Sequence, residues 1–68
     1  MSAFRPRDQV IVDYPGHVTH EHRGAVTKGM TRLKFGYTMI GPLYGVKMMS
    51  GKARGNEFWL PPEKLRLA

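Results

Sequence analysis

Cysteine is absent from this chain of 68 residues. Neither a disulfide framework nor a zinc site built on cysteine can therefore stabilise the fold. Long apolar runs are absent too: no segment is long enough to cross a bilayer, and no apolar core of a signal peptide follows the charges of the first seven residues. We therefore expect a cytoplasmic protein with neither a signal peptide nor a membrane partner.

Acidic residues are scarce. Five Asp and Glu occur against eleven Lys and Arg, which gives a formal net charge of +6, and all five acids lie outside the segment 22–56. An acid-free segment in a basic domain favours a polyanionic partner, although an excess of positive charge can also serve solubility alone. The segment holds seven basic residues: Arg23, Lys28, Arg32, Lys34, Lys47, Lys52 and Arg54.

The short length predicts one domain, 1–68, that begins with a lead-in over residues 1–7. A chain of this size buries only roughly 60% of its unfolded surface, so its core is marginal. Five Met and seven aromatic residues (one Trp, three Tyr and three Phe) must supply much of the packing. Otherwise an interface with further copies of the chain must add to it, so a homo-oligomer is among the states we consider.

Hydrophobic residues recur with the two-residue period of β-strands, and no amphipathic helix of useful length is present. Glycine and proline provide the turn signals between strands, and Pro62 can begin a single helical turn before the last strand. Short strands separated by turns indicate a small barrel or sandwich. The predicted strand segments are 9–14, 24–30 with a bulge or bend at Gly29, 32–39, which Gly41-Pro42 breaks, 43–49, 58–60 and 65–67.

The two-residue period also predicts which side chains share a side of each strand. The clearest alternation lies in 32–39, where we expect an apolar side against the core and a basic side in solvent. The predicted sets are Val10, Val12 and Tyr14; Leu33, Phe35, Tyr37 and Met39, opposite Arg32, Lys34, Gly36 and Thr38; and Tyr44, Val46 and Met48.

The order of these segments resembles that of SH3-like small β-barrels. The resemblance rests on Asp-Gln-Val-Ile-Val at 8–12, Tyr-Gly-Val-Lys at 44–47 and Phe-Trp-Leu-Pro-Pro-Glu-Lys-Leu at 58–65. Gly-Ala-Val at 24–26 is similar to the KOW-type signature, in which a strand and a loop lead to Gly-x-Val; the loop here is longer and rich in His. The resemblance implies an all-β fold, a single SH3-like five-stranded small barrel with one short 3-10 turn before the last strand. Because KOW and Tudor-like members bind RNA, ribosomes or polymerase surfaces, it also implies a non-enzymatic binding module.

A basic strand side is the leading candidate site. Lys and Arg beside aromatic residues and glycines allow close approach to phosphates and stacking of bases, so we predict binding of nucleic acid, with RNA favoured, or of a ribonucleoprotein surface. The alternative is a protein-interaction or self-associating module that docks on an acidic partner. The residues predicted to contact nucleic acid or a partner are Arg23, Lys28, Arg32, Lys34, Tyr44, Lys47, Lys52, Arg54 and Trp59.

The orientation of Trp59 stays open. If Phe58 and Leu60 pack inward, Trp59 faces out and can stack on a ligand or contact a protein. In the other register Trp59 is the main aromatic residue of the core, because a short strand does not specify its register.

Neither metal binding nor catalysis is predicted. His17, His20 and His22 flank Glu21 in one loop, but the spacing misses the His-x-x-Glu-His motif and lies outside a helix, so these residues are only weak metal candidates. There is no cysteine nucleophile, and neither Ser2 nor Ser50 has a base beside it in the sequence. We therefore expect a binding protein without a cofactor and without enzymatic activity.

Overall fold

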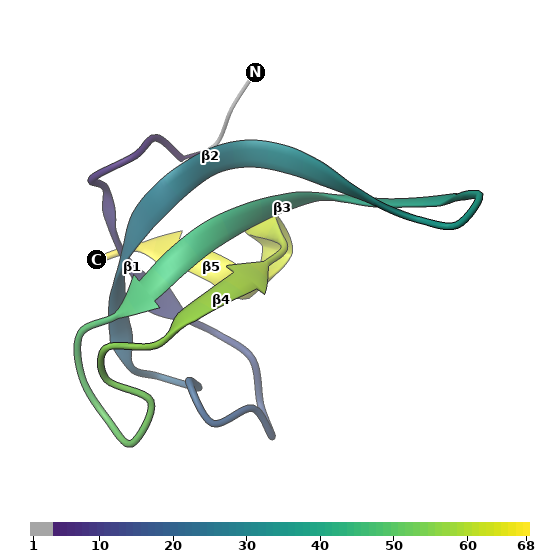
Figure 1. The fold of residues 1–68 in the computed structure, drawn as a ribbon. Coiled ribbons are helices and arrows are strands. Elements are labelled where there is room, and N and C mark those ends of the chain that lie inside the picture. Colours follow the sequence, from purple (N-terminus) through teal and green to yellow (C-terminus); the bar gives the residue numbers. More distant parts are fainter. Residues whose placement is uncertain (1–3) are drawn as a thin grey trace.

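The computed structural model describes residues 4–68, whose strands form one open antiparallel sheet (Figure 1). The strand order across the sheet is β4-β3-β2-β1-β5. The expected all-β class is confirmed, and the predicted 3-10 turn lies directly before the last strand. The elements are β1 (Gln9–Val12), β2 (Arg23–Phe35), β3 (Thr38–Met48), β4 (Glu57–Leu60), the 3-10 turn η1 (Pro62–Lys64) and β5 (Leu65–Leu67).

The hydrophobic core lies on one side of the sheet. Val10 and Val12 are fully buried, as the alternation in the first strand predicted, and Tyr14 packs against the core. Val26 of β2 pairs with Val46 of β3, and both face inward. The buried hydrophobic residues of the described chain are Phe4, Val10, Val12, Val26, Tyr44, Val46, Met48, Ala53, Leu60 and Leu65. This set confirms the common side predicted for the second half of β3.

β2 and β3 are longer than predicted and extend beyond the other strands as a projecting hairpin (Figure 1). The prediction of one continuous strand through 32–39 is wrong, because the chain reverses at Gly36-Tyr37. Gly36 has a φ of +61°, which suits a two-residue hairpin turn with glycine in its first position. A two-residue turn leaves the alternation of apolar residues intact, so the period alone did not distinguish a hairpin from a strand.

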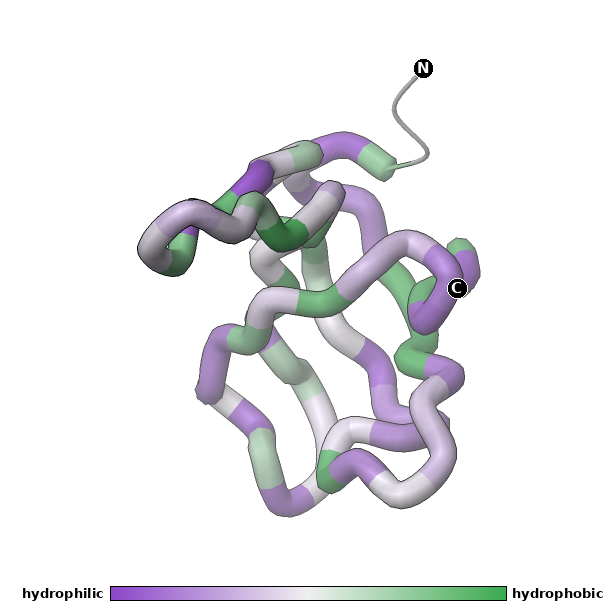
Figure 2. Tube along the Cα trace, turned by 90° about the vertical axis from the view of Figure 1, so that its right-hand side faces the viewer, coloured by the Kyte–Doolittle hydropathy of each residue, from purple (hydrophilic) through white to green (hydrophobic). Residues whose placement is uncertain are grey.

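The apolar side chains of this hairpin are exposed, so the prediction that they pack against the core is wrong. Phe35 is 60% exposed, Met39 57% and Tyr37 105%. Met39 pairs with Lys34, whereas Phe35 pairs with Thr38, so Met39 and Phe35 lie on opposite sides of the hairpin. Figure 2, in which the hairpin side of the molecule faces the viewer, shows hydrophobic positions in the hairpin as well as in the body of the sheet.

Of the two irregularities that the sequence predicted at glycines, one is confirmed and the other is wrong. The predicted bulge at Gly29 is confirmed, since the β2–β3 register shifts both between Val26 and Lys28 and between Lys28 and Thr31. The predicted interruption at Gly41-Pro42 is wrong, because β3 runs through this pair, whose peptide bond is cis. A Cβ atom at Gly41 would lie 2.9 Å from the carbonyl oxygen of Thr31, so only glycine permits this close approach of the two strands.

Candidate nucleic-acid interface

The side of the sheet that turns away from the core carries the candidate site. Alternation in β2, β3 and β4 places every second residue there, and the strand register puts Lys47 between Ala25 and Glu57 and puts Gly45 beside Trp59. We call this surface the outer face; its side chains are those of Ala25, Thr27, Lys28, Lys47, Glu57 and Trp59.

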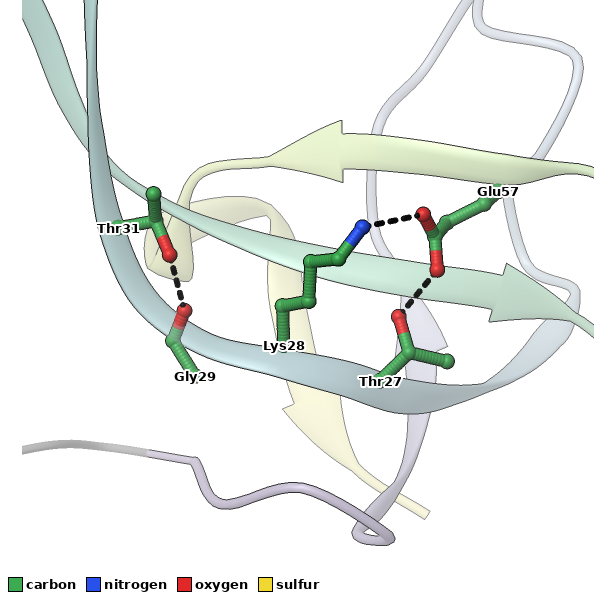
Figure 3. A network of polar contacts seen from close by, with 5 residues as sticks. All are labelled: Thr27, Lys28, Gly29, Thr31 and Glu57. Atoms are coloured by element: carbon green, nitrogen blue, oxygen red, sulfur yellow. Dashed lines mark hydrogen bonds and ion pairs between the residues drawn. The ribbon is translucent and has the colours of Figure 1, made fainter.

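Glu57 joins β2 to β4 at the centre of the outer face (Figure 3). The Thr27 hydroxyl donates a hydrogen bond to Oε2 of Glu57 at 2.5 Å, and Nζ of Lys28 lies 3.1 Å from Oε1. The same Nζ lies 5.3 Å from the centre of the Trp59 ring, within the range of a cation–π interaction. A Cβ atom at Gly45 would lie 3.0 Å from Cβ of Lys28, so glycine leaves the space in which the lysine stem crosses β3.

Trp59 faces outward, which decides between the two registers. Its side chain is 38% exposed, whereas Leu60 is buried and Phe58 packs against the core. The indole ring therefore presents a face to solvent with a cation beside it. Such a surface can stack on a planar ligand and approach a negative charge at the same time.

The pKa of the Glu57 carboxyl is held below its ordinary value of 4.5, first by the hydrogen bond from Thr27 and then by that from Lys28. The unfolded chain therefore takes up this proton more readily than the folded protein does. The interaction stabilises the fold above pH 4.5, and the stabilisation is lost as the pH falls through the lower folded pKa.

Replacing Glu57 with glutamine is expected to lower the melting temperature at neutral pH by no more than a few degrees, because the group is exposed. The melting temperatures of Glu57→Gln and wild type should converge as the pH falls through the lowered pKa of Glu57, because both side chains are then neutral. Thermal unfolding followed by circular dichroism measures this difference. Glu63→Gln, in η1, controls for the loss of one negative charge. If the melting temperatures of Glu57→Gln and wild type differed by the same amount at acidic and neutral pH, the ionised Glu57 carboxylate would not be what stabilises the fold.

A shallow hollow of about 390 Å³ opens beside this network. Its apolar floor and two cations come from β2, β3 and the loop before β4. Within residues 4–68, neither Lys47 nor Arg54 belongs to an ion pair, so both charges remain available to a ligand. The lining residues are Ala25, Thr27, Lys47, Met48, Met49, Arg54 and Gly55.

The fold separates the predicted contact residues into groups. Lys28, Lys47, Arg54 and Trp59 lie on the outer face or beside its hollow, whereas Arg32 and Lys34 lie on the projecting hairpin. Arg23 begins β2, where its backbone N–H donates to the hydroxyl of Ser50 at 3.1 Å, and Lys52 is exposed in the loop between β3 and β4. The single basic strand side expected from the sequence is therefore two basic surfaces.

The prediction that Tyr44 is a surface contact is wrong. Tyr44 is 1% exposed, and its ring meets that of Phe4 edge to face at 5.3 Å between centroids. Side chains alternate between the two sides of β3, so Tyr44 lies on the inner side together with Val46. Sequence reasoning missed Thr27, Glu57 and Met49, which became part of the site only when the strand register placed them beside the cations.

The histidines of the loop after β1 are used within that loop. The His17 ring stacks on Tyr14 at 4.9 Å between centroids, and its Nδ1 lies 2.7 Å from the hydroxyl of Thr19. Nδ1 of His20 accepts a hydrogen bond from the backbone N–H of Tyr14 at 3.0 Å. His22 lies against Gly51, away from this stack. Across the residues that the structure describes, no three His, Asp or Glu side chains gather in a way that could hold a metal ion.

No helix among residues 4–68 is long and apolar enough to span a membrane. Compared with protein-family models, with curated proteins and with solved structures, the chain has no significant match. The function of the candidate site is therefore inferred from the chemistry of the chain's own residues.

Proposed function

We propose that the protein is a non-enzymatic binding module that holds nucleic acid, with RNA favoured, on its outer face. The observation that carries the proposal is that Lys47 and Arg54, neither of which belongs to an ion pair within residues 4–68, line one hollow on the side of the sheet that also carries the exposed indole of Trp59. Cations neutralise phosphates and release their counterions, while an aromatic ring stacks on any base. This combination favours binding with little base specificity.

We further propose that the sheet closes as an SH3-like barrel. Three features support closure. β5 pairs with β1, and the backbone N–H of Asp13 donates to the carbonyl of Lys64 in η1 at 2.7 Å. β4 and β5, at opposite ends of the strand order, are joined by residues 61–64 alone, and Leu60 and Leu65 belong to the same core. A barrel of this kind would hold the outer face rigid.

The salt dependence of binding tests the proposed function. A labelled single-stranded RNA of about 12 nucleotides should bind with a slope of about −2 to −3 in log affinity against log salt, which corresponds to three or four neutralised phosphates. Lys47→Gln and Arg54→Gln should each weaken binding and make this slope shallower by about 0.7. Fluorescence anisotropy measured from low to physiological salt provides both quantities.

Lys64→Gln is the matched control, because it removes the same charge from a lysine that lies 4.9 Å from the Tyr14 ring and not in the hollow. Its affinity should fall much less than that of the two outer-face variants. Absence of binding at low salt, or an affinity that does not change with salt, would overturn the proposal.

A second candidate function is docking on an acidic protein or self-association. The exposed apolar side chains of the hairpin favour it, since large apolar groups in solvent often mark protein interfaces. Sedimentation over a concentration series tests self-association, and a monomer at every concentration would remove that version.

A further inference from the structure

The part of the hairpin beyond the sheet is a free two-stranded ribbon. β1 pairs with β2 only as far as Ala25, and β4 pairs with β3 only from Tyr44 onward. Residues 31–43 of the two strands therefore pair with each other alone among the described residues. We call this segment the ribbon.

The ribbon has two chemically different sides. Because directly paired residues share a side, Leu33 and Ile40 lie together with Phe35 and Thr38. The opposite side carries Lys34 with Met39, and also Arg32, which faces Gly41. Tyr37 lies in the turn at the tip, with its side chain fully in solvent.

The apolar side is most open at its far end. Phe35 is 60% exposed beside the turn, whereas Ile40, 44% exposed, lines a hollow that it shares with Pro61 and Glu63. Large exposed apolar groups that cluster on one element indicate an interaction surface.

Charge identifies the class of occupant. The segment 22–56 holds seven cations and no acid, and two of them, Arg32 and Lys34, lie on the ribbon, on the side opposite Phe35. A second copy of the chain would bring the same formal charge of +6, which opposes self-association through this basic segment. An anionic partner with flat apolar groups fits both sides of the ribbon, and nucleic acid supplies phosphates and bases together.

The exposure of the aromatic residues identifies the form of the nucleic acid. In a duplex the flat faces of the bases are already stacked on one another, whereas single strands, loops and bulges offer these faces to aromatic side chains. Phe35 and Tyr37 stand clear of any neighbouring strand, so a base can reach their rings.

We infer that the ribbon stacks unpaired bases of a single-stranded or looped nucleic acid on Phe35 and Tyr37, with Arg32 and Lys34 beside the phosphates. This inference rests on the proposed function and names its substrate class. Gly45, beside Trp59, lies eight positions after Tyr37, which at about 3.3 Å per residue spans roughly 26 Å. At about 3.4 Å per stacked nucleotide, a strand that contacts both sites needs about eight nucleotides.

The test compares Phe35→Ala and Tyr37→Ala with wild type on a single-stranded RNA of about 12 nucleotides and on a fully paired duplex of the same length. Each variant should bind the single strand about tenfold more weakly and the duplex as wild type does. The loss should shrink for strands shorter than about eight nucleotides, which cannot contact the ribbon and Trp59 together. Tyr37→Phe should restore the affinity, because it keeps the ring.

Leu67→Ala is the matched control, since Leu67 is 62% exposed on β5 and belongs to neither surface. Melting temperatures show that the variants remain folded. If Lys47→Gln weakens binding while the two ribbon variants bind the single strand as wild type does, the proposed function stands and the inference is overturned. An equal loss on single strand and duplex, or a wild-type dimer that the ribbon variants abolish, would overturn it too. No binding of wild type to any oligonucleotide would remove the proposed function and the inference with it.

Discussion

Replacing Tyr44 with alanine is expected to leave the protein largely unfolded at room temperature. The Tyr44 side chain is 1% exposed and meets the Phe4 ring edge to face. Truncating a large buried aromatic residue to alanine costs about 3–5 kcal/mol, because contacts are lost and a cavity remains. A domain of this size has a total stability of only about 3–5 kcal/mol, so the loss is comparable with the whole.

Circular dichroism and thermal melting measure this effect, and Tyr37→Ala is the matched control. The same substitution at Tyr37 removes a ring that is fully exposed, so the melting temperature should stay near that of wild type. The two substitutions should therefore affect different measurements. Tyr44→Ala should unfold the protein, whereas Tyr37→Ala should leave it folded and weaken its affinity for single strands. A folded Tyr44→Ala protein with weakened binding would restore the surface role that the sequence suggested for Tyr44.

Replacing Gly24 with alanine is expected to destabilise the fold by about 1–3 kcal/mol, the typical cost of overpacking a core. A Cβ atom at Gly24 would lie 2.6 Å from Cγ1 of Val46, 3.1 Å from the carbonyl oxygen of Lys47 and 3.1 Å from Sδ of Met48. Both Val46 and Met48 are fully buried, so neither can move away without disturbing the core. The midpoint of urea unfolding should fall while the slope of the transition stays unchanged.

Gly29→Ala provides the comparison, because it adds the same methyl group to the same strand. Among the residues that the structure describes, apart from the chain neighbours of Gly29, the only heavy atom within 4 Å of a Cβ at this position is Cδ of Pro6 at 3.9 Å, an ordinary contact distance. This substitution should be neutral, or stabilising by up to about 1 kcal/mol, since alanine restricts the unfolded chain. Equal effects at Gly24 and Gly29 would show that packing against β3 is not what requires glycine at position 24.

The Gly-x-Val pattern at 24–26 has a packing explanation in this fold. Gly24 pairs with Met48 and Val26 pairs with Val46, so β2 presents alternately no side chain and a valine to the inner side of β3. The sequence revealed this pattern because it is local and depends on two neighbouring positions of one strand. The buried state of Val10 and Val12 was predictable for the same reason.

The site was less predictable than the core. The cations of the acid-free segment are evident from composition, but Lys47 and Arg54 adjoin one hollow while Lys34 lies on the ribbon. The ion pair of Lys28 with Glu57 joins residues 29 positions apart in the chain. Such a contact follows from the register of β2, β3 and β4. The sequence of one strand alone does not determine its register against the neighbouring strands.

The sequence by itself determined the β class, the alternation of each strand, the turn before β5 and the location of positive charge along the chain. These features depend on neighbouring residues and on composition, which act within a few positions. Only the tertiary structure decided that Tyr44 is buried while Phe35 and Tyr37 are exposed, that Trp59 faces outward, and that the cations form two surfaces. Burial and clustering depend on which distant strands meet, because a two-residue period specifies two sides of a strand without specifying what covers either of them.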